Sequence, residues 1–229
     1  VCDDNTIPKI NSLNSKEWQK EKQKVKKHVE EIAKELVLLY AKRNKEQGFA
    51  FSKDTPWQRE FEDSFKYELT YDQKQAIKEV KADMESPVPM DRLLCGDVGY
   101  GKTEVAIRAA FKAVMDSKQV AYLVPTTVLS YQQYTTFKNR MEPFGIKVEM
   151  LSRFRTKKEQ TKILKDLVDG KIDIIIGTHR LLSKDVFFKD LGFLIIDEEH
   201  RFGVKAKEEI KMLKKNIELM RITVYNNCG

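Results

Sequence analysis

Residues 96–103 of this 229-residue chain read Gly-Asp-Val-Gly-Tyr-Gly-Lys-Thr, and this segment constrains the fold more than any other. It fits the pattern G-x-x-x-x-G-K-[S/T], follows an apolar segment at residues 92–95 and opens a predicted helix at residues 102–116. The glycines let the backbone turn tightly, so that successive N–H groups and the helix N-terminus can face a phosphate group. We therefore expect a phosphate-binding loop that joins a β-strand to an α-helix.

This loop predicts a nucleotide site. Lys102 would reach the β- and γ-phosphates, and the hydroxyl of Thr103 would hold Mg²⁺. A bare glycine turn is the alternative, but the strand before the loop and the helix after it favour phosphate binding. The predicted nucleotide-binding residues here are Gly96, Asp97, Val98, Gly99, Tyr100, Gly101, Lys102, Thr103 and the adjacent Glu104.

Strand-like and helical segments alternate from residue 70 onward. We predict helices at residues 71–85, 102–116, 127–141 and 157–168. We predict strands at residues 92–95, 119–124, 146–151, 172–176 and 193–196. Strands that alternate with helices of this length imply right-handed crossover connections. The expected fold class is therefore α/β, with a parallel sheet covered by helices on both faces.

A second motif supplies carboxylates. The apolar residues 193–196 lead directly into the sequence Asp-Glu-Glu-His at residues 197–200. Ligands of open α/β sheets bind at the carboxyl ends of the strands, so we expect Asp197 to hold Mg²⁺ near the phosphate loop. Glu198 would polarise the water that attacks the γ-phosphate, and His200 would report the nucleotide state to a bound nucleic acid. A solvated acidic turn is the alternative. The predicted catalytic residues are Lys102, Asp197, Glu198 and His200.

The chain before residue 70 predicts two further segments. Asn14 and Glu17 resemble a capping box, and apolar residues then recur at helical spacing as far as Gly48. A helix over residues 15–47 would span roughly 50 Å, about right for linking two domains, although a core or coiled-coil helix is the alternative. We expect three regions, namely a tail and long connecting helix at 1–48, an ordered connector at 49–69 and the α/β lobe at 70–229.

Composition excludes several classes of protein. Hydrophobic residues make up 41% and charged residues 34% of the chain, which is typical of a globular protein rather than a disordered one. No apolar run approaches the roughly 18 residues of a membrane span, and residues 1–10 do not resemble a secretion signal. Three widely spaced cysteines indicate neither a disulfide framework nor a zinc site. We expect a cytoplasmic protein, and the net charge of +7 is compatible with nucleic-acid binding.

The phosphate loop and the carboxylate motif together resemble motifs I and II of superfamily 2 helicases and translocases. Five segments also look like the first motor lobe of the bacterial transcription-repair coupling factors: residues 93–106, 123–129, 151–156, 176–186 and 194–204. Residues 15–64 are similar to the segment that joins the RNA-polymerase-binding domain of that family to its motor. The RecG helicases share the DNA motifs but usually have serine at the position of Tyr100, so the coupling factors are the better match.

The resemblance implies a RecA-like lobe that uses ATP and Mg²⁺, with roles for residues whose chemistry alone is ambiguous. Phe65, Thr70 and Gln73 correspond to the element that reads adenine, in which an aromatic ring covers the base and an amide contacts its edge. Other residues correspond to motifs that hold one DNA strand by its phosphates. These predicted nucleic-acid-binding residues are Thr126, Thr127, Arg153, Arg155, Thr178, His179 and Arg180. Helix caps and solvated arginines are the alternatives.

The implied function is that of a double-stranded DNA translocase that displaces stalled RNA polymerase and couples transcription to nucleotide excision repair. RNA polymerase and the repair proteins would bind parts of the full protein outside this chain. After Leu219 the chain departs from the family, since motif III and the second motor lobe with its arginine finger are missing. We therefore expect a fragment or truncated product that binds nucleotide but hydrolyses little. The alternatives are a lobe of a RecG-like branch-migrating helicase and a nucleotide-dependent binding module that never turns over.

Overall fold

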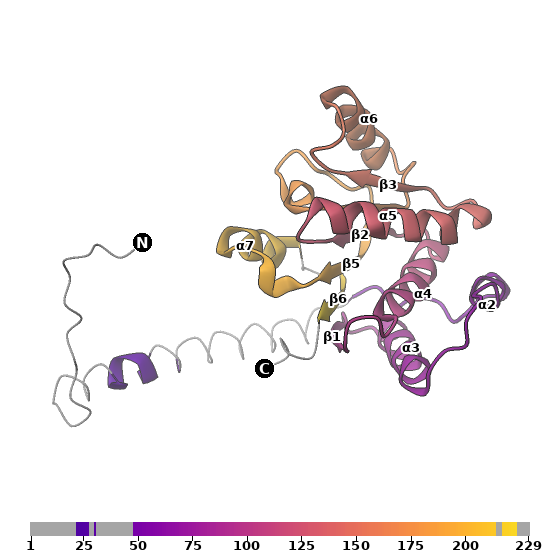
Figure 1. Ribbon diagram of the computed structural model, residues 1–229, viewed down its shortest axis with the longest axis horizontal. Coiled ribbons are helices and arrows are strands. Elements are labelled where there is room, and N and C mark those ends of the chain that lie inside the picture. The colour runs from indigo at the N-terminus through magenta and orange to yellow at the C-terminus, as the bar shows by residue number, and fades with distance from the viewer. Residues whose placement is uncertain (1–21, 28–29, 31–47, 214–216, 224–229) are drawn as a thin grey trace. The chain divides into compact units, whose positions relative to one another are not determined.

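The computed structural model describes residues 22–27, 30, 48–213 and 217–223 (Figure 1). The chain forms two units, residues 1–45 and residues 46–229. In the first unit residues 22–27 and 30 are helical, whereas the rest of the helix predicted over residues 15–47 lies outside the described residues. Within the described part of the chain, no helix has the length and apolar character needed to cross a lipid bilayer.

Six parallel strands form one sheet in the second unit, in the order β1-β6-β5-β2-β4-β3. The strands are β1 (Asp91–Cys95), β2 (Gln119–Leu123), β3 (Val148–Leu151), β4 (Ile174–Gly177), β5 (Leu191–Asp197) and β6 (Glu218–Thr223). Every pairing is parallel, so all the strands end at the same edge of the sheet. The predicted parallel sheet is confirmed, and β1 to β5 lie within two residues of the predicted strands.

Strand β6 corrects the sequence-based prediction, which placed no strand after residue 196. It pairs with β1 on one side and with β5 on the other, so it lies between the strand of the phosphate loop and the strand that ends at Asp197. Its two charged residues obscured the strand pattern. The Glu218 carboxylate accepts a hydrogen bond from the Met90 N–H at 2.6 Å, and Arg221 forms an ion pair with Asp91 at 2.8 Å.

The helices of this unit are α2 (Pro56–Asp63), α3 (Tyr71–Met84), α4 (Lys102–Met115), α5 (Thr127–Met141), α6 (Lys157–Val168) and α7 (Val204–Leu213). Short 3₁₀ helices lie at η1 (Glu142–Phe144), η2 (His179–Leu182) and η3 (Glu199–Arg201). Helices α3 to α6 match their predicted bounds within one residue, whereas α2 and α7 were not predicted. Threonines define several starts: Thr55 and Thr126 cap α2 and α5, and Thr70 and Thr156 form capping boxes with the third residue of α3 and α6.

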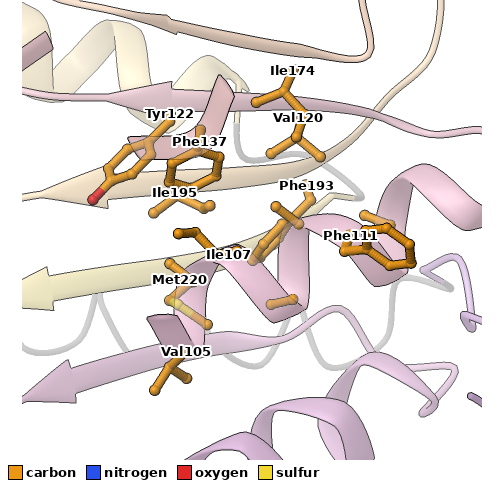
Figure 2. Close-up of a cluster of buried hydrophobic side chains, with 14 of the residues drawn as sticks. Val105, Ile107, Phe111, Val120, Tyr122, Phe137, Ile174, Phe193, Ile195 and Met220 are labelled. Carbon is orange, nitrogen blue, oxygen red and sulfur yellow. The ribbon is translucent and has the colours of Figure 1, made fainter. Parts of the chain in front are cut away.

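Helices cover both faces of the sheet, as predicted. Buried residues of α2, α3, α4 and α5 form one cluster with one face, and buried residues of α6 and α7 form a second cluster with the other. Along β2, Val120 and Tyr122 join the first cluster while Ala121 and Leu123 join the second, as the alternation of a strand requires. Figure 2 shows the first cluster, with the hydroxyl of Tyr122 pointing toward the carboxyl ends of the strands.

Residues 49–69 lie in the same compact unit as the sheet. The Phe61 ring is fully buried and stacks on Phe111 of α4, with ring centroids 4.0 Å apart. Lys112 of α4 is also buried and forms ion pairs with Asp54 at 3.0 Å and with Glu85 at 2.8 Å. These contacts fix the segment against the helix that follows the phosphate loop. The predicted boundaries at residues 48 and 69 stay predictions.

Cys95, the last residue of β1, is disulfide-bonded. A single disulfide is not a framework, so the absence of a disulfide framework stays a prediction. Wide spacing along the sequence carried no signal of the pairing.

Candidate nucleotide site and nucleic-acid surface

The predicted phosphate loop is a tight turn between β1 and α4. Gly99 has φ +83° and Gly101 has φ +67°, values in the left-handed region that glycine adopts without strain. Gly101 is the N-cap of α4, so the first N–H groups of the helix open toward the loop. The ammonium of Lys102 donates to the carbonyl oxygens of Gly96 and Asp97, both at 2.6 Å. The Lys102 ammonium therefore lies against the backbone of the loop, where we expect phosphate oxygens to bind.

Gln73 connects this loop to the start of α3. Its side-chain carbonyl accepts from the Thr70 N–H at 2.9 Å, and its amide donates to the Tyr100 carbonyl at 2.8 Å. A Cβ atom at Gly101 would meet the Gln73 amide nitrogen, so the flexible Gln73 side chain would have to shift, and it is the positive φ of Gly101 that favours glycine. The residue that the resemblance assigns to the adenine edge thus also positions the phosphate loop.

Phe65 and Glu104, both predicted to contact the nucleotide, meet the same two arginines. The guanidinium carbons of Arg108 and Arg140 lie 5.6 and 5.3 Å from the Phe65 ring centroid. The Glu104 carboxylate is buried and accepts from Arg108 at 2.9 Å and from Arg140 at 3.2 Å. Glu104 is therefore engaged within the protein, and the geometry does not support direct nucleotide contact by its side chain.

Asp197 ends β5 close to the phosphate loop. Burial raises the pKa of its carboxyl group to about 6, and repulsion from Glu198 adds to the effect, whereas the nearby positive charge of Lys102 lowers the pKa. The Tyr122 hydroxyl donates to the Asp197 carboxylate at 3.4 Å. Burial and the same carboxylate raise the pKa of Tyr122 well above its usual value, so this hydroxyl remains a donor.

Glu198 has an unusual backbone conformation, with φ +48° and ψ 51°. Its N–H donates to the Ile222 carbonyl of β6 at 2.9 Å, and its carboxylate forms an ion pair with Arg201 at 2.9 Å. Left-handed geometry in a non-glycine residue costs on the order of 1–3 kcal/mol and recurs at functional sites. His200 follows in η3 and is exposed. Strand β6, which the sequence did not reveal, therefore helps to hold the predicted catalytic carboxylate.

The residues present fit a magnesium nucleotide. A phosphate-loop hydroxyl at Thr103 and a carboxylate at Asp197 are oxygen ligands of the kind that Mg²⁺ prefers beside water and phosphate, and the Lys102 ammonium would bind the phosphate oxygens. Burial and the neighbouring Glu198 disfavour the charged form of Asp197, and a bound divalent cation would favour it.

The predicted nucleic-acid-binding threonines follow β2 and β4 at the same edge of the sheet. Thr126 caps α5 by accepting from the Leu129 N–H at 3.2 Å, and Thr127 is the first residue of that helix. Thr178 is buried at the end of β4, whereas the following His179 is exposed. The structure therefore brings these residues to one edge of the sheet, where Thr126 also fulfils the alternative role of a helix cap.

Two of the predicted arginines have carboxylate partners. Arg180 forms a bidentate pair with Asp185, with both distances 2.7 Å, which raises the pKa of Arg180 and lowers that of Asp185. Arg155 lies 3.7 Å from Glu149 and 3.5 Å from Glu159. These partners hold the guanidinium groups at the carboxyl edge. A bound phosphate would have to share each guanidinium group with its carboxylate partner.

A hollow of about 490 Å³ lies beside these residues, and sequence reasoning missed it. One wall comes from the first turns of α5, which contribute Thr127, Val128, Tyr131 and Tyr134. The other wall comes from β3 and the loop that follows it, which contribute Met150, Phe154 and Arg155. Tyrosines at i and i+3 of a predicted helix were a signal of a common face, but nothing local placed Phe154 opposite them. We call this feature the aromatic hollow.

Comparison with known proteins agrees with this geometry. The profile of the DEAD/DEAH box helicase family matches residues 70–226. The transcription-repair-coupling factor of Bacillus subtilis (strain 168) is 57% identical over 216 residues, which cover 94% of this chain and 18% of that protein. The transcription-repair-coupling factor of Staphylococcus epidermidis (strain ATCC 35984) is 54% identical over 223 residues, 97% of this chain and 19% of that protein. The chain thus spans about a fifth of the length of these relatives.

Two solved structures have a similar fold. RecG bound to a three-way DNA junction is 38% identical, with a TM-score of 0.71 over 80% of this chain and 25% of that chain. The DUF1998 helicase MrfA is 16% identical, with a TM-score of 0.58 over 76% of this chain and 30% of that chain, and this likeness supports the fold alone. The fold is that of a RecA-like helicase lobe.

Proposed function

Because the chain belongs to the DEAD/DEAH box helicase family, we propose that it is the ATP-binding first lobe of a double-stranded DNA translocase. In the whole protein this motor displaces stalled RNA polymerase and couples transcription to nucleotide excision repair, in the cytoplasm. The identity of 57% to a transcription-repair-coupling factor over 94% of the chain supports this role. RNA polymerase and the repair proteins bind parts of the protein outside this chain.

One observation carries the proposal. The phosphate loop and the Asp197–Glu198 motif end strands on either side of β6, and Lys102 is close enough to Asp197 to lower the pKa of its carboxyl group. A P-loop lysine beside a strand-end carboxylate is the arrangement that ATP hydrolysis requires. Bound Mg²⁺ would neutralise charge that develops on the phosphates.

Each residue then has a defined task. The N–H groups of residues 96–103 bind the phosphates, and the Lys102 ammonium exchanges its carbonyl acceptors for phosphate oxygens. Thr103 and Asp197 would hold Mg²⁺, which would supply positive charge beside the phosphates. Glu198 orients the attacking water and accepts its proton. Phe65 and Gln73 would bind the adenine ring, and His200 would report the nucleotide state to bound nucleic acid.

The lobe alone should bind Mg-ATP weakly and turn over slowly, because an arginine finger from a second lobe supplies about 10³- to 10⁵-fold in comparable enzymes. The test uses the full-length protein that contains this chain. We expect duplex DNA to stimulate its ATPase and ATP to drive release of a stalled transcription complex, with both activities lost in Lys102→Ala. An ATPase that ignores DNA would contradict the translocase role.

The alternative is a RecG-like branch-migrating helicase, which the 38% identity to RecG on a three-way junction favours. The two candidates differ in substrate. A RecG-like protein would remodel three-way junctions and leave a stalled transcription complex on linear duplex in place. The opposite pattern supports the coupling-factor role.

A further inference from the structure

The aromatic hollow lies between the two loops that are predicted to hold DNA phosphates. Thr127, after β2, and Arg155, after β3, both line it. Figure 1 shows α5 running beside β3, so the first turns of α5 and the end of β3 form its opposite walls. A ligand that follows the predicted phosphate track would therefore pass over the hollow.

The walls carry apolar rings that the fold itself leaves exposed. Tyr131 is 61% exposed, Phe154 is 64% exposed and Val128 is 72% exposed. Single exposed apolar residues are ordinary on protein surfaces, but a concave group of them marks a binding site. A volume of about 490 Å³ lies within the range of small-molecule sites, and it is large enough for a planar ring system.

Cationic groups surround the rings. The guanidinium carbon of Arg153 lies 5.8 Å from the Phe154 ring centroid, and Arg155 lines the hollow itself. Two exposed lysines, Lys157 and Lys158, begin α6 shortly afterwards. Aromatic faces next to positive charges are the combination by which proteins bind single-stranded nucleic acid, since the rings stack on bases and the cations hold the phosphates.

We infer that the aromatic hollow binds one unstacked nucleobase of the DNA strand that the lobe contacts, with Tyr131 and Phe154 as the stacking faces. The inference rests on the proposed function, because it adds a base contact to a DNA-binding lobe. Since every base has a π-face, the contact is independent of sequence. It gives the motor a preference for duplex in which one base is unpaired, which phosphate contacts alone cannot provide.

The test measures the affinity of the full-length protein for two duplexes that differ in one group. One carries a single unpaired nucleotide, and the other carries an abasic residue at that position, so the number of phosphates is the same. We expect the base to strengthen binding by about fivefold to about a hundredfold. The double variant Tyr131→Leu/Phe154→Leu should reduce that ratio to about one, whereas Tyr131→Phe, which keeps the ring, should preserve it.

Phe187→Leu is the matched control, because Phe187 is 63% exposed but does not line the hollow. It should leave the ratio unchanged. Equal affinity of the wild type for the base and the abasic residue would overturn the inference, as would an unchanged ratio in a folded double variant. A double variant that keeps the ratio but fails to release polymerase would assign the hollow to a protein partner, and would also overturn it. Failure of the proposed function is separate, since the wild type would then show no duplex-stimulated ATPase.

Discussion

The carboxyl edge of the sheet has two halves that are built differently. After β1, β6 and β5 it presents mainly backbone groups and carboxylates, fixed by glycines with positive φ, by the Gln73 hydrogen bonds and by the strained Glu198. After β2, β4 and β3 it presents hydroxyls, guanidinium groups and exposed rings. A backbone site suits one ligand of fixed shape. Long side chains suit an extended ligand that has to slide.

The largest effect should come from removing the predicted general base of the first half, Glu198. Glu198→Gln keeps the size and the backbone geometry of the residue but cannot accept a proton. We expect the ATPase of the full-length protein to fall by about 10²- to 10⁴-fold, with Mg-ATP binding retained. Steady-state hydrolysis and equilibrium nucleotide binding measure the two steps. Equal loss of both would contradict the role of Glu198.

Removal of the Lys102 ammonium should weaken ATP binding and also slow ATP turnover. Lys102→Ala loses the ammonium that neutralises the β- and γ-phosphates, so we expect kcat/KM for ATP to fall by about 10²- to 10³-fold. Duplex affinity without nucleotide should not change, because the two halves use different residues. A parallel loss of nucleotide-free DNA binding would show that the halves are not separate.

Asp197 in the first half should lower the free energy of unfolding, because burial opposes ionisation of its carboxyl group. Its pKa of about 6 lies above the usual 3.8, so the folded chain binds more protons than the unfolded chain and stability falls as pH rises from about 4 to about 6. In the absence of Mg²⁺ and nucleotide, Asp197→Asn should therefore stabilise this chain by about 3 kcal/mol at pH 8 and by little at pH 4.

Denaturant unfolding at the two pH values checks this prediction. Asp185→Asn in the second half is the control, because the exposed Arg180–Asp185 pair should contribute less than about 1 kcal/mol. A destabilised Asp197→Asn at pH 8 would show that Asp197 is a structural carboxylate.

The smallest effect should come from single phosphate contacts in the second half. Arg153→Ala should weaken duplex binding similarly on unrelated sequences and lower the slope of log K against log salt by about 1. Titrations at several salt concentrations give the slope. A loss of duplex affinity that depends on the DNA sequence would contradict a phosphate contact by Arg153.

Local patterns predicted the first half better than the second. The glycine-rich loop and the apolar run before Asp197 are contiguous in sequence, so their place at strand ends could be predicted, whereas the chemistry assigned to them stays a prediction. Strand β6 was missed because Glu218 and Arg221 interrupt its apolar pattern, and their partners, which include Met90 and Asp91, come from distant parts of the chain. The same strand fixes Glu198 through the Ile222 carbonyl, so the backbone conformation of that residue depends on a distant segment.

The missed features have a common physical cause. The aromatic hollow joins α5 to the loop after β3, and the Glu104 ion pairs join α4 to α5. Such contacts depend on tertiary packing, which periodicity does not encode. Helix α2 shows the same limit, since Thr55-Pro56 is a start signal but its eight residues are too few to establish a period.

Amide hydrogen exchange on the full-length protein tests the division of the sheet edge most directly. Mg-ADP alone should protect the N–H groups of residues 96–103, because they bind the phosphates, and should leave residues 126–129 and 152–156 unchanged. Duplex DNA alone should protect residues 126–129 and 152–156 and leave residues 96–103 unchanged. Protection of residues 96–103 by DNA, or no protection of residues 126–129 and 152–156 by bound DNA, would contradict the account.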